Sequence, residues 1–202
     1  MIYQRISPVL FRHQSNDQHG FTPQVRIEDA LLCAEQAIEY SLEFSDPLWL
    51  MSIDMRKAFD TIEHGAIFQS LSDIGIDEGY ITLLRLLYQN QTGSVNGSDS
   101  FDIDRGVKQG DVLSAVIFNC VLDMAFEAWK LRLSDQGLYI GPGLCRLTNS
   151  RYADDILLYA KSIDELIQMS EMLIDELAKV GLRLNTRRRY YDQIFNSITR
   201  SC

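Results

Sequence analysis

The sequence predicts an α+β fold in which helices cover an antiparallel-dominated sheet. Three observations lead to this prediction. Long segments of the 202-residue chain carry apolar residues at helical spacing. Shorter runs rich in strand-forming residues lie between these segments. No repeat, low-complexity stretch or linker rich in Pro, Gly and Ser divides the chain, so the elements are expected to share one core.

The first half of the chain predicts a long helix, a buried strand and two short helices. Residues 27–44 carry apolar or small side chains at helical spacing. After Pro47, the almost continuous apolar run 48–53 predicts a buried strand, which delivers the carboxylate of Asp54 at its end. Two shorter helical patterns follow, at 65–71 and 78–88.

The middle of the chain predicts a hairpin followed by a long helix. Asn96-Gly97 is a turn signal, and residues 101–105 would form part of the same hairpin region. A single apolar stripe runs through residues 112–133, which predicts a long helix.

The last third predicts a pair of strands, a helix and one further strand. Ser162 followed by Glu165 is a capping box, and it opens a helix that Gly181 closes. The expected strands of this part are 144–152, 156–160 and 182–184.

Composition limits the classes of function. The chain has 19 Lys and Arg against 28 Asp and Glu, a net charge of −9, and this balance on its own speaks against a nucleic-acid binder. Its four cysteines form no CxxC or CxxH pair, which argues against a zinc site and fits a reducing compartment. No uninterrupted apolar run approaches the roughly 18 residues of a membrane span, and the N-terminal segment lacks the apolar core of a secretory signal, so no membrane partner is expected.

The adjacent pair Asp154-Asp155 is the sharpest chemical feature. Neighbouring residues of a straight strand point to opposite faces, so two adjacent carboxylates converge only at a turn, which the flanking strands predict. Carboxylates held close repel each other unless a cation intervenes, and Mg²⁺ prefers oxygen ligands. Asp54, at the end of another strand, would supply a third carboxylate. Asp residues are also common in ordinary turns, so the pair alone leaves a structural role open.

A series of motifs carries a resemblance to a known family. The series consists of residues 54–60 (DMRKAFD), 105–114 (RGVKQGDVLS), 118–119 (FN), 152–155 (YADD) and 181–185 (GLRLN), in this order. It resembles the palm of reverse transcriptases, specifically those of non-LTR retrotransposons and their group II intron relatives. The resemblance implies a right-hand polymerase palm. Residues 1–47 would be partial fingers, 48–185 the palm, and 186–202 an unmatched tail, with the thumb absent.

The resemblance implies which residues hold the metal ions. Asp54, Asp154 and Asp155 match the catalytic, metal-binding aspartates of the family. The backbone carbonyl of Met55 matches a further metal ligand. Two Mg²⁺ ions are the expected cofactors, with Mn²⁺ as a substitute.

The resemblance also implies a nucleotide-binding set. Phe59 matches the aromatic ring that excludes the 2′-hydroxyl of an incoming nucleotide and so selects dNTPs. Gln109 and Gly110 match the loop that packs near the incoming nucleotide and the template base. Without this resemblance, a structural role for Phe59 in the hydrophobic core would be equally well supported.

The implied activity is that of an RNA-directed DNA polymerase acting on an RNA template, a DNA primer and dNTPs. The chain would be a fragment of a larger polyprotein, and nuclear by analogy with eukaryotic retroelements. Arg188 lies nearest the position where the family has a Lys that can protonate pyrophosphate, and the earlier fingers motifs that grip the triphosphate are missing. Two alternatives follow: an inactive, truncated palm with a nucleic-acid-binding or structural role, and another two-metal enzyme such as a nuclease or cyclase.

Overall fold

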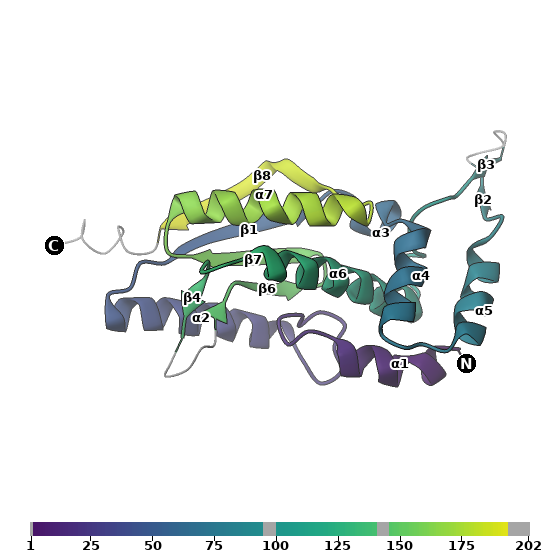
Figure 1. Cartoon of the computed structure of the whole chain (residues 1–202), viewed down its shortest axis with the longest axis horizontal. Helices are drawn as coiled ribbons and strands as arrows, with labels where there is room; N and C mark the ends of the chain where they lie inside the picture. Colours follow the sequence, from purple (N-terminus) through teal and green to yellow (C-terminus); the bar gives the residue numbers. More distant parts are fainter. Residues whose placement is uncertain (1, 95–99, 141–145, 194–202) are drawn as a thin grey trace.

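A four-stranded antiparallel sheet forms the centre of the computed structural model, which describes residues 2–94, 100–140 and 146–193 (Figure 1). The strand order is β6-β7-β1-β8. The strands are β1 (Trp49–Met55), β6 (Asn149–Tyr152), β7 (Asp155–Ala160) and β8 (Leu184–Gln193). Two short pairs lie outside this sheet: β2 (Thr92–Gly93) with β3 (Phe101–Asp102), and β4 (Leu138–Tyr139) with β5 (Arg146–Leu147).

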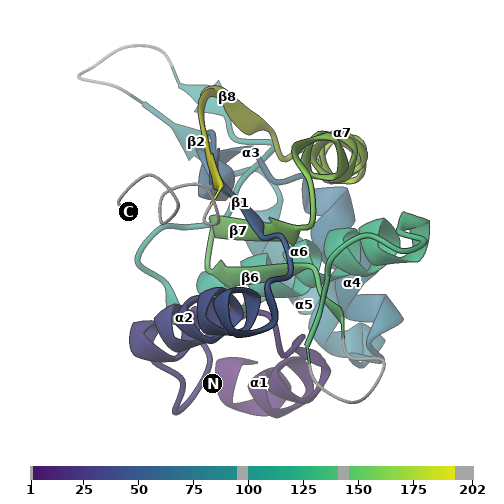
Figure 2. The same ribbon diagram turned by 90° about the vertical axis from the view of Figure 1, so that its left-hand side faces the viewer.

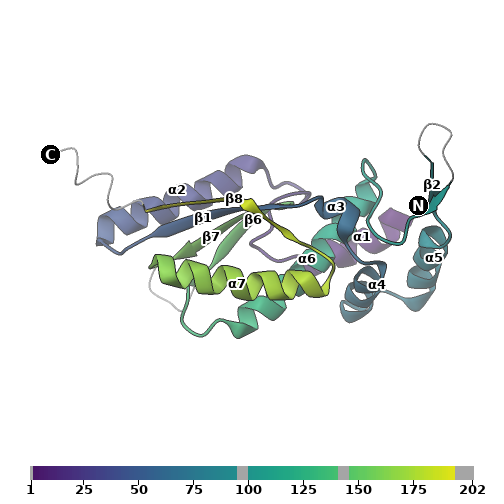
Figure 3. The same ribbon diagram turned by 90° about the horizontal axis from the view of Figure 1, so that it is seen from above.

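Helices cover both faces of the sheet. Figures 2 and 3 show α6 (Val112–Arg132) and α7 (Ile163–Lys179) on one side and α2 (Ile27–Phe44) on the other. Two further helices, α1 (Ile2–His13) and α4 (His64–Asp73), pack on α6. The remaining helices of the described residues are α3 (Ala58–Thr61) and α5 (Glu78–Tyr88). The predicted α+β fold is therefore confirmed.

The alternation of side chains in the central strands separates two cores. Met51 and Ile53 of β1 point into the main core beneath α6 and α7, where they meet Leu158 of β7. Leu50 and Tyr159 point to the opposite face, into a smaller core below α2. Side chains alternate between the two faces along each strand. Asp54 of β1 and Asp155 of β7 are therefore directed to the α2 face, away from α6 and α7.

Helix α6 is the central helix of the main core. Its N-terminal Asp111 caps it by accepting a hydrogen bond from the Leu113 N–H at 3.0 Å. Trp129 is fully buried and donates its ring N–H to the carbonyl of Met169 in α7 at 2.9 Å. Among the described helices, α6 alone is long and apolar enough to cross a membrane, yet 67% of that stretch is buried inside the fold, as in any core helix.

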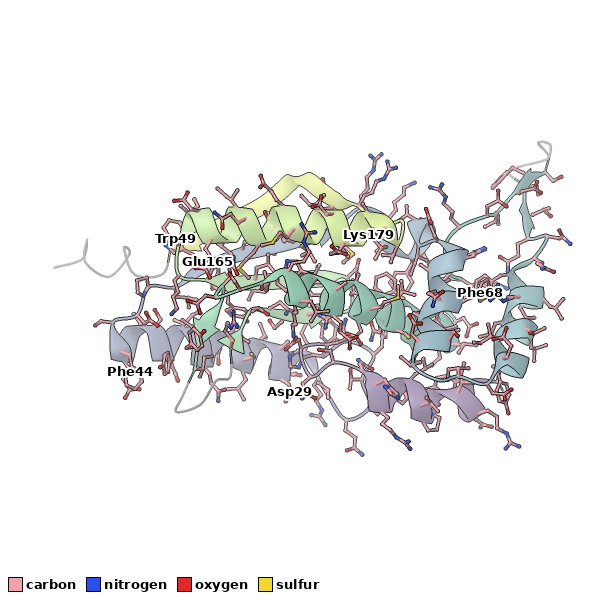
Figure 4. The ribbon with its side chains drawn as sticks, in the orientation of Figure 1. Asp29, Phe44, Trp49, Phe68, Glu165 and Lys179 are labelled. Atoms are coloured by element: carbon pink, nitrogen blue, oxygen red, sulfur yellow. The ribbon has the colours of Figure 1, made fainter. Side chains whose placement is uncertain are left out.

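Helix α7 begins and ends as its sequence predicts. The Ser162 hydroxyl accepts a hydrogen bond from the Glu165 N–H at 3.2 Å. The Glu165 carboxylate accepts from the Lys161 N–H at 3.1 Å, so the reciprocal half of the predicted capping box goes to a neighbouring backbone group. Figure 4 shows Glu165 near the start of α7 and Lys179 near its end, the arrangement of charge that a helix dipole favours.

The structure differs from the sequence analysis at both ends of the chain, and it also adds the short elements α3 and β4. Helix α1 contains Pro8, but Ile6 and Leu10 are buried at helical spacing, so the sequence analysis overlooked an amphipathic pattern there. Strand β8 replaces the short strand expected at 182–184, and its backbone pairs with β1 as far as Gln193. Part of the expected tail 186–202 is thus a sheet edge. The turn predicted at 95–97 lies outside the described residues, although the flanking strands β2 and β3 do pair.

Candidate active site

Asp54 and Asp155 face each other across β1 and β7. The antiparallel register ends with Ile53 opposite Ile156, so Asp54 and Asp155 are the next cross-strand neighbours. Both positions are on the α2 face because side chains alternate along each strand. Asn185 of β8 donates a hydrogen bond from Nδ2 to Oδ2 of Asp54 at 3.1 Å, which orients this carboxylate.

Asp154 lies in the hairpin loop between β6 and β7. Tyr152 pairs with Asp155, which leaves Ala153 and Asp154 as a two-residue loop. Ala153 has a φ of 58°, and a positive φ at the first loop residue is what a type II′ hairpin turn requires. The turn predicted from the sequence is therefore present, with Asp154 inside it and Asp155 as the first residue of β7.

The three carboxylates influence one another electrostatically. Partial burial raises the pKa of Asp155, and the negative charges of Asp154 and Asp54 raise it further. Among the described residues, no Lys or Arg side chain forms an ion pair with Asp154 or Asp155. A bound cation would relieve this repulsion, since a nearby positive charge favours the ionised carboxylates.

The donor set fits Mg²⁺. It offers carboxylate oxygens without thiolate or imidazole, and Mg²⁺ is usually held by one or two carboxylates together with substrate phosphates. In the described part of the chain, no three His, Cys, Asp or Glu side chains are grouped closely enough to hold one ion by themselves. The side chain of Met55 is buried, so its backbone carbonyl is the atom that would reach an ion, and its role stays a prediction.

A cavity of about 620 Å³ joins Asp154 to the predicted nucleotide-binding residues. Phe59, Gln109 and Gly110 all line this cavity. The Phe59 ring stacks on that of Phe118 from α6, with centroids 4.5 Å apart and 18° between the planes, so it is supported from behind. Residues from three distant segments of the chain thus meet in one pocket, as the motif series predicts.

The loop that carries Gln109 is held against α3. The Val107 N–H donates to the Phe59 carbonyl at 2.7 Å, and Gln109 Nε2 donates to Asp60 Oδ1 at 3.1 Å. Gly106 has a φ of 90°, and a Cβ there would lie 2.9 Å from the carbonyl oxygens of Phe59 and Asp60. Only glycine combines this backbone conformation with this close approach, which explains its place in the motif.

Two aromatic residues of the pocket were missed by the sequence analysis. Tyr3 of α1 and Phe21 both line the cavity. The Phe21 ring meets the edge of the Phe59 ring, with 6.3 Å between centroids and 86° between planes. Tyr3 lies at helical spacing from Ile6 and Leu10, a pattern that the sequence analysis overlooked, whereas the one signal for Phe21 is its place directly after Gly20.

Comparison with known proteins identifies the family. Residues 1–188 match the family described as reverse transcriptase (RNA-dependent DNA polymerase). The chain belongs to this family. It is 31% identical over 173 residues to the retrovirus-related Pol polyprotein of the type-2 retrotransposable element R2DM of Drosophila melanogaster, a match that covers 83% of the chain. It is 37% identical over 115 residues to a type-1 R2 polyprotein of Popillia japonica, which covers 54% of the chain. The predicted reverse transcriptase of a non-LTR retroelement is thereby confirmed.

The relatives are much longer than this reverse transcriptase domain. The chain spans 16% of the Drosophila polyprotein and 18% of the Popillia one. Among solved structures, an apo telomerase from Candida tropicalis, truncated from its C-terminal domain, superposes with a TM-score of 0.69 over 95% of this chain and 40% of the telomerase chain. Its sequence is 16% identical, so this likeness confirms the fold alone.

Proposed function

We propose that this domain catalyses RNA-directed DNA synthesis, transferring a nucleotide from a dNTP to the 3′-hydroxyl of a DNA primer on an RNA template. The observation that supports the proposal most strongly is the cavity in which Asp154 lies together with Phe59 and the Gln109-Gly110 loop. A carboxylate that can hold metal ions and a pocket wide enough for a nucleotide are therefore side by side. Neither a nuclease nor a cyclase has an evident use for Phe59 and this loop.

The side chains of the site have separate roles in the proposed reaction. Asp54, Asp154 and Asp155 would hold two Mg²⁺ ions, which when bound lower the pKa of the attacking hydroxyl and stabilise the leaving pyrophosphate. Asn185 keeps the Asp54 carboxylate in one orientation. The Phe59 ring, fixed by Phe118, would exclude a 2′-hydroxyl from the sugar position.

Primer extension tests the activity. The assay uses an RNA template, a labelled DNA primer, dNTPs and either Mg²⁺ or Mn²⁺. We expect extension by the native chain and by Asp164→Asn, an exposed aspartate of α7 that serves as the matched control. We expect none from Asp154→Asn. Extension by Asp154→Asn at the native rate would overturn the proposal, and a chain inactive in every form would favour the alternative of an inactive palm.

Metal binding tests the role of Asp54 directly. Mn²⁺ affinity is measured from the electron paramagnetic resonance signal of the free ion, without nucleic acid. Asp54→Asn keeps the size of the side chain and its contact with Asn185 but removes a charged ligand, so we expect a large loss of affinity. Unchanged affinity would remove Asp54 from the site.

Nucleotide selection tests the role of Phe59. Phe59→Val removes the ring and is expected to raise the ratio of kcat/KM for ribonucleotides over deoxyribonucleotides by about 10-fold or more, the scale of a steric pocket change. The control is Phe101→Val, which replaces an aromatic residue of β3 that is 52% exposed and lies outside the cavity. An equal ratio in both variants would assign Phe59 to the core only.

The relatives' names suggest the setting in which the domain works. Because the chain spans less than a fifth of the Drosophila polyprotein and of the Popillia one named above, we propose that it functions as part of a larger polyprotein that supplies further contacts to nucleic acid. Nuclear localisation stays a prediction made by analogy with eukaryotic retroelements.

A further inference from the structure

A segment near the N-terminus covers the open edge of the hairpin that carries Asp154. Strand β6 is the outer strand of the sheet, so one side of its backbone lacks a strand partner. The Arg151 N–H donates to the carbonyl of Asp17 at 2.7 Å, and the His19 N–H donates to the carbonyl of Arg151 at 2.8 Å. The intervening residue, Gln18, therefore lies alongside the hairpin loop.

The side chain of Gln18 holds both backbone groups of one loop residue. Its Oε1 accepts a hydrogen bond from the Ala153 N–H at 2.9 Å, and its Nε2 donates to the Ala153 carbonyl at 3.2 Å. The same Oε1 accepts from the Gly20 N–H at 2.9 Å. Gln18 is 2% exposed and Ala153 6%, so water does not compete for these bonds.

Two features of Ala153 explain why its backbone is stabilised by the Gln18 side chain. Its φ of 58° is a conformation that favours glycine, so the alanine persists there only because its surroundings hold it. Its N–H and carbonyl are buried, and in the hairpin loop neither has a ladder partner. A carboxamide satisfies both groups at once because it presents an acceptor and a donor in one plane.

The packing around Gln18 leaves little freedom for the loop. A Cβ on Gly20 would lie 2.2 Å from the Ala153 nitrogen, so the two backbones are in close contact. Asn119 of α6, 1% exposed, donates from Nδ2 to the Gly20 carbonyl at 2.8 Å. The helix that begins beside the Gln109 loop is thus tied through Gly20 to the turn that carries Asp154.

We propose that Gln18 is a positioning residue of the active site. Its carboxamide fixes Ala153, and through the next peptide bond it fixes where the Asp154 carboxylate stands relative to Asp54 and Asp155. The role in catalysis rests on the proposed polymerase function, whereas the hydrogen-bonded clamp on Ala153 is a property of the folded chain itself. Gln18 touches no reacting atom, so it acts only through the geometry of the turn.

The clamp is tested first by amide hydrogen exchange in the metal-free chain, followed by ¹⁵N nuclear magnetic resonance. Gln18→Met keeps the length of the side chain and removes both hydrogen bonds to Ala153, together with the one from the Gly20 N–H. We expect exchange at Ala153 to accelerate about 10-fold or more, relative to the Tyr159 amide, which donates to the Thr148 carbonyl in the same sheet and reports global opening. Gln18→Glu keeps the acceptor for the Ala153 N–H, so its Ala153 protection should stay near that of the native chain. Equal exchange in Gln18→Met and the native chain overturns the clamp.

Positioning is tested by two further measurements on Gln18→Met. We expect Mn²⁺ affinity to fall about 10-fold, and kcat for primer extension to fall by the same factor or more while the KM for dNTP changes little, because a displaced ligand weakens the chemistry more than nucleotide binding. The matched control is Gln36→Met on the exposed side of α2, for which neither quantity should change. Native metal affinity together with native kcat would reduce Gln18 to a structural residue.

These readouts separate the proposal from the function on which it rests. If the native chain extends no primer, the proposed function fails, but Ala153 exchange and Mn²⁺ affinity still decide whether Gln18 positions the carboxylates. If Gln18→Met does not fold, Gln18→Asn takes its place, since its carboxamide is one methylene shorter and cannot hold both Ala153 groups in the same way. A native kcat and native Mn²⁺ affinity in a folded Gln18→Asn chain would then count against the positioning role.

Discussion

Replacing Asp123 by Asn should destabilise the domain severely, because it leaves the buried guanidinium of Arg151 without a compensating charge. The Arg151 side chain is fully buried and that of Asp123 is 7% exposed, with Nη2 and Oδ1 2.8 Å apart. Arg151 Nε and Nη1 have no hydrogen-bond partner among the described residues. The guanidinium also lies over the Phe126 ring, 4.1 Å from its centroid. Asp123 therefore supplies the negative charge that compensates the buried guanidinium of Arg151.

The size of the effect follows from this geometry. Removing one partner of a buried ion pair costs about 3–5 kcal/mol, since the other charge stays buried without compensation. In a chain of this size each kcal/mol lowers Tm by about 2–4 °C, so the expected loss is roughly 6–20 °C. Urea unfolding followed by circular dichroism measures the free energy, and a thermal scan measures Tm.

Two further variants make this prediction specific. Asp175→Asn removes the exposed partner of Arg132 and should cost no more than about 1 kcal/mol, as exposed pairs do. The double variant Asp123→Leu, Arg151→Met replaces the buried pair by apolar side chains and should recover most of the lost stability. If Asp123→Asn costs no more than Asp175→Asn, the reasoning about the buried charge is refuted.

Three smaller perturbations test other parts of the structure. Asp155→Asn should raise the Tm of the metal-free chain at pH 7, because the raised pKa of Asp155 means that its ionised carboxyl is unfavourable in the folded state. This gain in Tm should vanish below the unfolded pKa of about 3.9. A gain in Tm that does not change with pH would contradict this cause. Gly110→Ala should cost about 1–2 kcal/mol in urea unfolding through backbone strain alone, since φ is 85° and the Cβ position is open; no loss would show that the loop relaxes. Trp129→Phe should cost about 0.5–1.5 kcal/mol by removing the ring N–H that donates to the buried Met169 carbonyl, and a neutral result would mean that another donor replaces it.

The helices were the most predictable part of the fold. The predicted ranges 27–44 and 78–88 coincide with α2 and α5, because apolar residues at helical spacing mark a helix in the sequence itself; the spacing did not show which side is buried, since Ile27 and Leu31 of the α2 stripe are exposed. The strand that ends near Asp54 was equally clear, since β1 is buried in the centre of the sheet. By contrast, β8 lies at the sheet edge and its arginine-rich segment 187–189 has no apolar alternation, so backbone pairing alone defines it.

The pocket was predicted by motifs rather than by periodicity. Phe59, Gln109 and Gly110 were chosen because their motifs resemble a family, and nothing in their local pattern shows that they meet Asp154 in one cavity. Net charge gave the opposite indication, since −9 speaks against a nucleic-acid binder. Total charge sums over the whole surface, whereas the carboxylates that a metal site needs make any such domain more acidic.

The residues behind the hairpin that carries Asp154 could not have been predicted from the sequence in this way. Gln18, Asn119 and Arg151 are polar, fully buried and far apart along the chain, and a sequence pattern counts such residues as loop or surface. Their burial is possible because each has a partner that only the tertiary structure supplies: the Ala153 backbone, the Gly20 carbonyl and the Asp123 carboxylate. These buried polar groups lie behind the Ala153-Asp154 turn. This turn must hold the Asp154 carboxylate in place against electrostatic repulsion from its neighbours.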